Sequence, residues 1–112
     1  MNNKDIIIAI DIAVLEVENY IKKYDLPEDS QLITHTLKVL SLLKNELFQN
    51  KDTVNERLLR GFKDICTTTA IHYEHTNFND AIFNVNEKLE QKFDNYKYLE
   101  LLRMDFGKGE PI

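Results

Sequence analysis

A chain of 112 residues has the size of one domain and can bury a hydrophobic core without disulfides or metal ions. Hydrophobic residues make up 43% and charged residues 29%, which is ordinary for a soluble globular protein, and three glycines with two prolines favour helices over a sheet-rich or low-complexity chain. The net charge of -5 argues against nucleic acid as a partner, because phosphate binding needs a basic surface, whereas a basic protein would be attracted.

The single cysteine and the residues near the N-terminus indicate the cellular compartment in which the protein is expected. Cys66 is the single cysteine, so neither an internal disulfide nor a cysteine-based zinc pattern can form, which is typical of a reducing environment. Asp5 and Asp11 interrupt the apolar residues near the N-terminus well before a membrane-spanning length is reached. We therefore expect a cytoplasmic protein with neither a secretory signal nor a membrane span.

The first predicted helix is the element around which the chain is organised. Apolar residues recur every three or four positions over Ile6–Tyr24, which predicts one buried helix face. The opposite side carries Ile8, Ile12 and Leu15. We expect other helices of the same domain to cover this second apolar side. The alternative is a surface for a partner or for self-association into a homodimer.

The same helical spacing recurs four more times. We predict further helices at Gln31–Phe48, Val54–His75, Asn79–Phe93 and Tyr98–Phe106, the last one short and followed by a tail that is flexible from about residue 107. Short connections favour antiparallel neighbours. The prediction is therefore one all-α domain over residues 1–112, an antiparallel up-and-down bundle of four main helices plus a short C-terminal helix and an extended tail.

Several polar residues are suited to begin these helices. Asn2 or Asn3 can cap the first one. Thr53 and Glu56 have the spacing of a capping box, in which each side chain accepts a hydrogen bond from the backbone amide of the other residue, and this box predicts the start of the third helix. Residues 76–80 supply a break followed by a new cap.

The third helix carries the residues that come nearest to a metal site. Asp64, His72 and His75 are ligand types that zinc accepts. Asp64 lies two or three helical turns from the two histidines, and His72 projects toward the apolar side, so one ion cannot easily reach all of them. We expect His72 at the edge of the core, Asp64 in a surface ion pair and His75 near the helix C-terminus, where its positive charge suits the helix dipole. The run Thr67–Thr69 disfavours helix and predicts a kink or a functional demand.

A short segment of the second helix has a recognisable pattern. Residues 35–38 read His-Thr-Leu-Lys and are followed by Ser41. This resembles the His-x-Leu-Lys-Gly-x-Ser segment of histidine-containing phosphotransfer domains, with Val39 in the place of the family's glycine. The resemblance implies a small helical bundle in which His35 carries the phosphoryl group and Lys38 supplies a nearby cation.

The fourth helix has an acidic outer side with one aromatic residue. Phe83 is surrounded there, at helical spacing, by four acidic residues: Asp80, Glu87, Glu90 and Asp94. Protein interfaces use this combination, because the ring packs when it is desolvated and the charges steer the partner. The alternative is a charged outer surface whose aromatic ring packs under the C-terminal segment.

No nucleophile, cofactor cradle, metal cluster or basic patch stands out. We therefore predict a non-enzymatic binding protein that needs no cofactor or metal, binds neither nucleic acid nor membrane, and recognises a basic protein. In charge and class the chain is similar to bacterial immunity proteins, which neutralise toxins, often nucleases. Such a partner would meet Phe83, Glu87 and Glu90 on the fourth helix first. The alternatives are phosphotransfer through His35 and self-association through the first helix.

Overall fold

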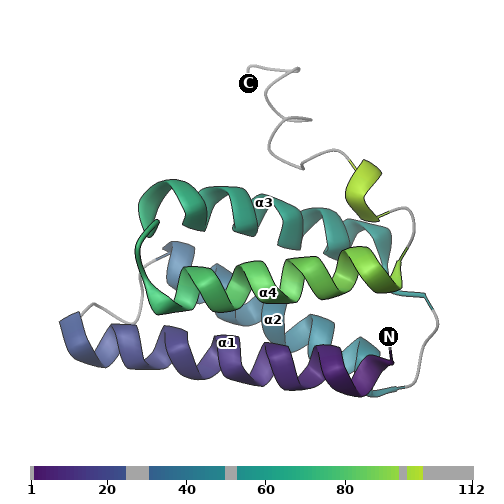
Figure 1. The fold of residues 1–112 in the computed structure, drawn as a ribbon, viewed down its shortest axis with the longest axis horizontal. Coiled ribbons are helices and arrows are strands. Elements are labelled where there is room, and N and C mark those ends of the chain that lie inside the picture. Colours follow the sequence, from purple (N-terminus) through teal and green to yellow (C-terminus); the bar gives the residue numbers. More distant parts are fainter. Residues whose placement is uncertain (1, 25–30, 50–52, 94–95, 100–112) are drawn as a thin grey trace.

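The described part of the chain folds into four α-helices that pack against one another (Figure 1). The computed structural model describes residues 2–24, 31–49, 53–93 and 96–99, and within these residues it contains no strand. The elements in chain order are α1 (Asn3–Tyr24), α2 (Gln31–Phe48), α3 (Glu56–His72), α4 (Asn77–Lys92) and the 3-10 helix η1 (Tyr96–Tyr98).

The core lies between the inner faces of the four α-helices. α1 packs against α2 and α4, and α3 packs against the same two helices, while η1 lies against α4. All four helices contribute buried side chains at helical spacing, among them Ile6, Ile10, Val17, Leu40, Leu43, Phe62, Ile65, Ile82, Val85 and Leu89. None of the helices in the described part of the chain is long and apolar enough to cross a membrane.

The start of α2 and the capping role of Asn2 at α1 agree with the sequence patterns. α2 has the predicted bounds, and α1 begins at Asn3, three residues before the predicted start. The side chain of Asn2 explains the earlier start, because its Oδ1 accepts a hydrogen bond from the backbone amide of Asp5 at 3.1 Å. Asn3 then links the two helices, since its Nδ2 donates to the carbonyl of Leu47 at 3.1 Å.

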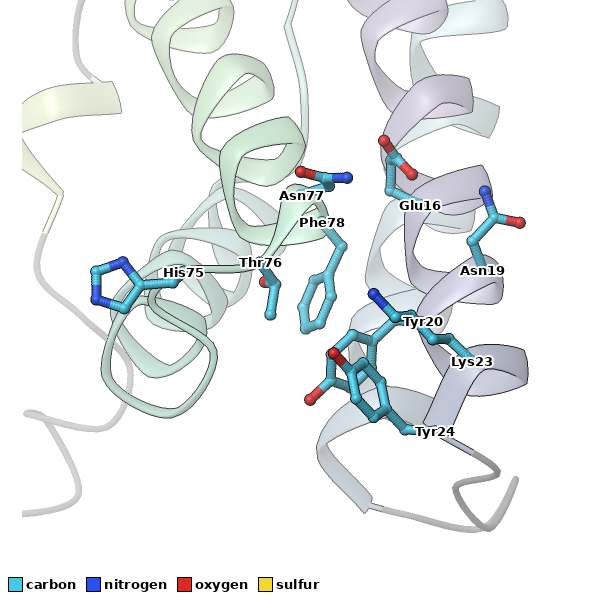
Figure 2. A pocket seen from close by; sticks show the side chains of 9 residues that line it. All are labelled: Glu16, Asn19, Tyr20, Lys23, Tyr24, His75, Thr76, Asn77 and Phe78. Carbon is cyan, nitrogen blue, oxygen red and sulfur yellow. The ribbon is translucent and has the colours of Figure 1, made fainter.

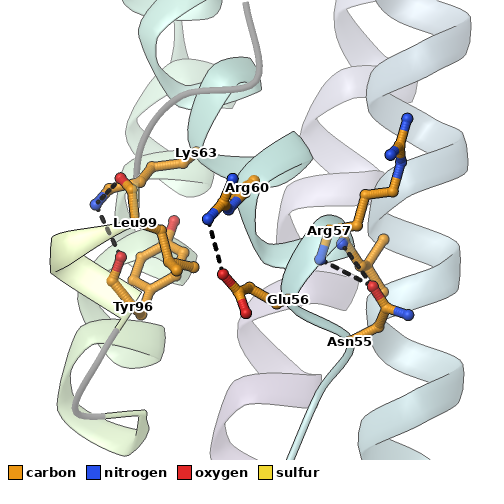
Figure 3. A network of polar contacts seen from close by, with 8 residues as sticks. Asn55, Glu56, Arg57, Arg60, Lys63, Tyr96 and Leu99 are labelled. Atoms are coloured by element: carbon orange, nitrogen blue, oxygen red, sulfur yellow. Dashed lines mark hydrogen bonds and ion pairs between the residues drawn. The ribbon is translucent and has the colours of Figure 1, made fainter. Parts of the chain in front are cut away.

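α3 begins with a different cap from the predicted one. Asn55 is the N-cap, and its Oδ1 accepts hydrogen bonds from the backbone amides of Arg57 at 2.8 Å and Leu58 at 3.2 Å. The prediction of a capping box formed by Thr53 and Glu56 is therefore wrong. The Glu56 carboxylate pairs instead with Arg60 one turn later, at 2.8 Å (Figure 3).

The connection between α3 and α4 comes earlier than predicted. α3 ends at His72, not His75, because Tyr73 leaves the helical conformation while its amide still donates to the carbonyl of Thr69. Thr76 caps α4 by accepting a hydrogen bond from the amide of Asn79 at 3.1 Å. α4 thus starts at Asn77, within the predicted break.

The three consecutive threonines do not interrupt α3. Each hydroxyl donates to a backbone carbonyl in the preceding turn: Thr67 to Lys63 at 3.3 Å, Thr68 to Asp64 at 2.9 Å and Thr69 to Cys66 at 3.3 Å. These bonds satisfy the hydroxyls inside the helix. The helix therefore continues through the threonine run to His72.

The C-terminal segment is attached to α3 and α4 by one aromatic residue and one lysine. Tyr96 is fully buried, and its hydroxyl donates to Oδ1 of Asn86 at 2.6 Å. Lys63 donates from Nζ to the carbonyls of Tyr96 at 2.8 Å and Leu99 at 3.2 Å (Figure 3). The predicted helix Tyr98–Phe106 lies, after Leu99, outside the described residues, as does the predicted tail.

Candidate functional site

The outer side of α4 carries an exposed aromatic ring among acidic residues. Phe83 is 54% exposed, and Asp80, Glu87 and Glu90 are exposed with it. We call these four residues the acidic-aromatic face. Asp94, the fifth residue predicted for this surface, lies outside the described residues. In the described part of the C-terminal segment, the ring that packs against the helices is Tyr96, and Phe83 keeps its exposed side.

Helical periodicity produces this arrangement. Phe78, Ile82, Val85 and Leu89 recur every three or four residues and are all buried, so they fix which side of α4 points inward. Positions 80, 83, 87 and 90 follow the same spacing on the opposite side. Phe83 therefore projects outward as a direct consequence of the burial of Ile82 and Val85.

Two carboxylates of the acidic-aromatic face have no ion-pair partner among the residues that the structure describes. Among the described residues, none pairs with the carboxylates of Asp80 and Glu87, and Glu90 acts on the interior only through its field, which favours the charged form of Lys63. Other exposed carboxylates do find partners, as in the pair of Lys44 and Asp11 at 2.7 Å. The outer side of α4 is therefore a negative surface around an apolar ring.

Cys66 on α3 and Tyr96 on η1 are titratable residues whose pKa values are shifted by burial. Burial raises the pKa of the Cys66 thiol to about 12, an effect that its hydrogen bond with Tyr96 partly offsets. Burial also raises the pKa of Tyr96 above its usual range. Desolvation lowers the pKa of Lys63, which the negative charge of Glu90 counteracts. A protonated, half-buried thiol is a poor nucleophile, so this cluster holds the C-terminal segment and does not point to catalysis.

The segment that resembles a phosphotransfer motif is accessible. His35 and Lys38 are both exposed on α2. Val39, in the place of the family's glycine, is buried in the core, and a shallow groove against α3 includes His35, Val39 and Leu42. The imidazole thus stands at the surface.

The second apolar side of α1 is not covered by other helices. Ile8, Ile12 and Leu15 are 48%, 49% and 56% exposed. α1 does have two helical neighbours, but α2 and α4 contact its other side, where Ile6, Ile10 and the other buried residues lie. The expectation that the rest of the domain would cover these three residues is therefore wrong.

The residues weighed as metal ligands do not converge. His72 is exposed and does not lie at the core edge, which corrects the prediction made for it. His75 lies in the turn after α3 and approaches Glu74, with 2.9 Å between Nε2 and Oε1. In the part of the chain that the structure describes, no group of three or more His, Cys, Asp or Glu side chains is placed to hold a metal ion.

A pocket with aromatic walls was not anticipated from the sequence. It lies between the C-terminal half of α1 and the start of α4, and has a volume of about 190 Å³ (Figure 2). The rings of Tyr20 and Tyr24 lie 4.6 Å apart between centroids, and the ring of Phe78 lies 5.0 Å from that of Tyr20. Glu16 and Lys23 also line it. Tyr20 and Tyr24 are one helical turn apart, but only the packing of α1 on α4 brings Phe78 to them.

No family model, no curated protein and no solved structure matches the chain. The case for its function consequently depends on the residues of this chain alone.

Proposed function

We propose that the protein is a non-enzymatic cytoplasmic binding protein that binds a basic protein through its acidic-aromatic face. The observation that carries the proposal is Phe83, which is 54% exposed on the side of α4 opposite the core. The carboxylates of Asp80 and Glu87 beside it have no partner among the described residues. A basic surface would neutralise these charges and cover the ring at the same time.

The two kinds of residue would contribute differently. Burying a phenylalanine side chain completely is worth about 1.5–3 kcal/mol, and about half of the Phe83 surface is still available for burial by a partner. The carboxylates would mainly accelerate association and exclude acidic proteins, because charges at the rim of an interface act through long-range attraction. The net charge of -5 also favours a positively charged partner.

The most concrete version of the proposal is an immunity protein that neutralises a basic toxin such as a nuclease. A nuclease must present a positive surface to bind phosphates. A small acidic helical domain that occupies this surface would block the substrate without any chemistry of its own. The contacts of α1 and α3 with both α2 and α4 support the finer arrangement that we also propose, an antiparallel up-and-down bundle.

The test is capture of a basic partner by the protein and by two variants of the face. We expect Phe83→Ala and Glu87→Lys each to weaken binding, and Glu87→Lys to lose more at low salt than at physiological salt, because salt screens exposed charges. Matched controls are Ile71→Ala, which removes an exposed apolar side chain from α3, and Glu18→Lys, which reverses an exposed charge on α1. A captured basic partner that binds both face variants as well as the parent would refute the proposal.

Self-association is the second candidate, favoured by the exposure of Ile8, Ile12 and Leu15 along one side of α1. Two copies could bury these residues against each other, as amphipathic helices do in homodimers. Analytical ultracentrifugation over a wide concentration range tests this candidate. A dimer that Ile12→Asp dissociates would support it, and a strict monomer at high concentration would exclude it.

A further inference from the structure

We infer that the aromatic pocket between α1 and α4 is a binding site for a primary alkylammonium group. Three observations carry the inference: the ring walls, the carboxylate of Glu16, and the position of the ammonium group of Lys23. The pocket shares no residue with the acidic-aromatic face, so this inference is independent of the proposed function.

The walls have the electronic character that attracts a cation. The ring of Tyr20 lies 4.6 Å from that of Tyr24 and 5.0 Å from that of Phe78 between centroids. Tyr73 extends the cluster with its ring 4.8 Å from that of Phe78. The face of an aromatic ring is the negative part of its quadrupole, and a desolvated cation over it is attracted. Because Tyr24 is half-exposed while Phe78 is buried, the rings form a wall and a floor that a ligand can reach from solvent.

The protein already places a cation of its own here. Nζ of Lys23 lies 5.3 Å from the centroid of the Tyr24 ring. In Figure 2 the Lys23 side chain extends across the pocket, with its nitrogen in the space between Glu16 and the rings. The arrangement therefore already holds an ammonium group on a flexible side chain, which a second ammonium group from another molecule can displace.

The polar residues around the pocket favour a cation over an anion. The Glu16 carboxylate pairs with none of the described residues and is free to receive a positive group. The hydroxyl of Thr76 is engaged, because it donates to the Tyr73 carbonyl at 2.7 Å and accepts from the amide of Asn79. The imidazole of His75 lies beside Glu74. Apart from Lys23, the described residues that line the pocket thus offer no unpaired positive group to bind an anion.

The size of the pocket limits the ligand to a small group. Its volume of about 190 Å³ is below the range of about 300–1,000 Å³ that is typical of pockets for drug-sized molecules. It would accommodate one side-chain-sized cation, and the lysine side chain that lines it, Lys23, itself ends in a butylammonium group. A primary alkylammonium group of that length is therefore the ligand to which we commit.

The probe for the test is butylammonium chloride, titrated into the ¹⁵N-labelled protein at constant ionic strength. We expect the backbone amide signals of Tyr20, Tyr24 and Phe78 to shift. Removal of the internal competitor by Lys23→Ala should tighten binding, and loss of the ring in Tyr24→Leu should weaken it, each by about two- to fivefold, the effect of one exposed cation-aromatic contact. Glu16→Gln, which removes the carboxylate, should weaken binding by up to about fivefold.

The controls separate the pocket from general electrostatics. Lys22→Ala removes the same charge from the neighbouring residue, which does not line this pocket, and should leave the affinity unchanged. 1-Butanol has the same alkyl chain without the charge and should not reproduce the shifts. Equal affinities in Lys23→Ala and Lys22→Ala, shifts that 1-butanol reproduces, or a stronger response to inorganic phosphate than to butylammonium would each overturn the inference.

Discussion

The attachment of the C-terminal segment can be tested at Tyr96, where the structure allows the hydroxyl and the ring to be treated separately. The side chain is fully buried, and its hydroxyl donates to Asn86 at 2.6 Å. Tyr96→Phe removes only the hydroxyl and should lower the free energy of unfolding by at least about 0.5–1.5 kcal/mol, the net worth of the hydrogen bond to Asn86 alone. Tyr96→Ala also removes the ring from the core and should cost about 3–5 kcal/mol.

These magnitudes can be measured by urea denaturation followed by far-UV circular dichroism. A domain of this size has a total stability of about 5–15 kcal/mol, so loss of the Tyr96 ring should move the midpoint strongly while the slope stays constant. Tyr98 is the control, because it belongs to the same 3-10 helix but is 76% exposed, and Tyr98→Ala should cost clearly less stability than Tyr96→Ala. If Tyr96→Ala cost no more than Tyr98→Ala, the segment would not be part of the core.

Three further predictions concern α3. Cys66 should react slowly with a disulfide reagent at pH 8 and rapidly after denaturation, because burial raises its pKa to about 12 and keeps the thiol protonated; a rate equal to that of the unfolded chain would contradict this. Asn55→Ala should cost about 0.5–2 kcal/mol by loss of the N-cap, measured by urea denaturation against the exposed control Asn84→Ala. Gly61→Ala should raise the melting temperature, since a Cβ at this helical position meets nothing within 4 Å and alanine is favoured by about 0.4–1 kcal/mol; a lower melting temperature would refute this.

The helices themselves were predictable because burial has a strict period in this chain. α2 has the predicted bounds, and the buried positions of α4 follow directly from the spacing of Ile82, Val85 and Leu89. The ends were harder, because adjacent polar residues compete for the same role. Thr53 and Asn55 both favour the N-cap position, and a contact distant in sequence distinguishes them: Glu46 on α2 accepts a hydrogen bond from the Asn55 amide at 3.1 Å.

The candidate sites differ in how far the sequence could predict them. The acidic-aromatic face lies within one helix, so spacing alone places Phe83 beside Glu87 on the side opposite the buried residues. The aromatic pocket needs Tyr20 from α1 and Phe78 from α4, and no local pattern shows which helices become neighbours. The role of Tyr96 was missed for the same reason, because its partner Lys63 is 33 residues away in sequence.

The apolar residues left outside the core are the strongest argument for a binding role. α1 and α4 each bury a complete inner set of side chains without Ile8, Ile12 or Phe83. β-branched and aromatic residues are poorer helix formers than lysine or glutamate, so at exposed helical positions they bring no intrinsic advantage to folding. They also expose apolar surface to water, which burial would relieve. These side chains bring folding no advantage of their own, which is consistent with the proposed coverage by a second molecule, and the face variants distinguish a basic partner on α4 from a second copy on α1.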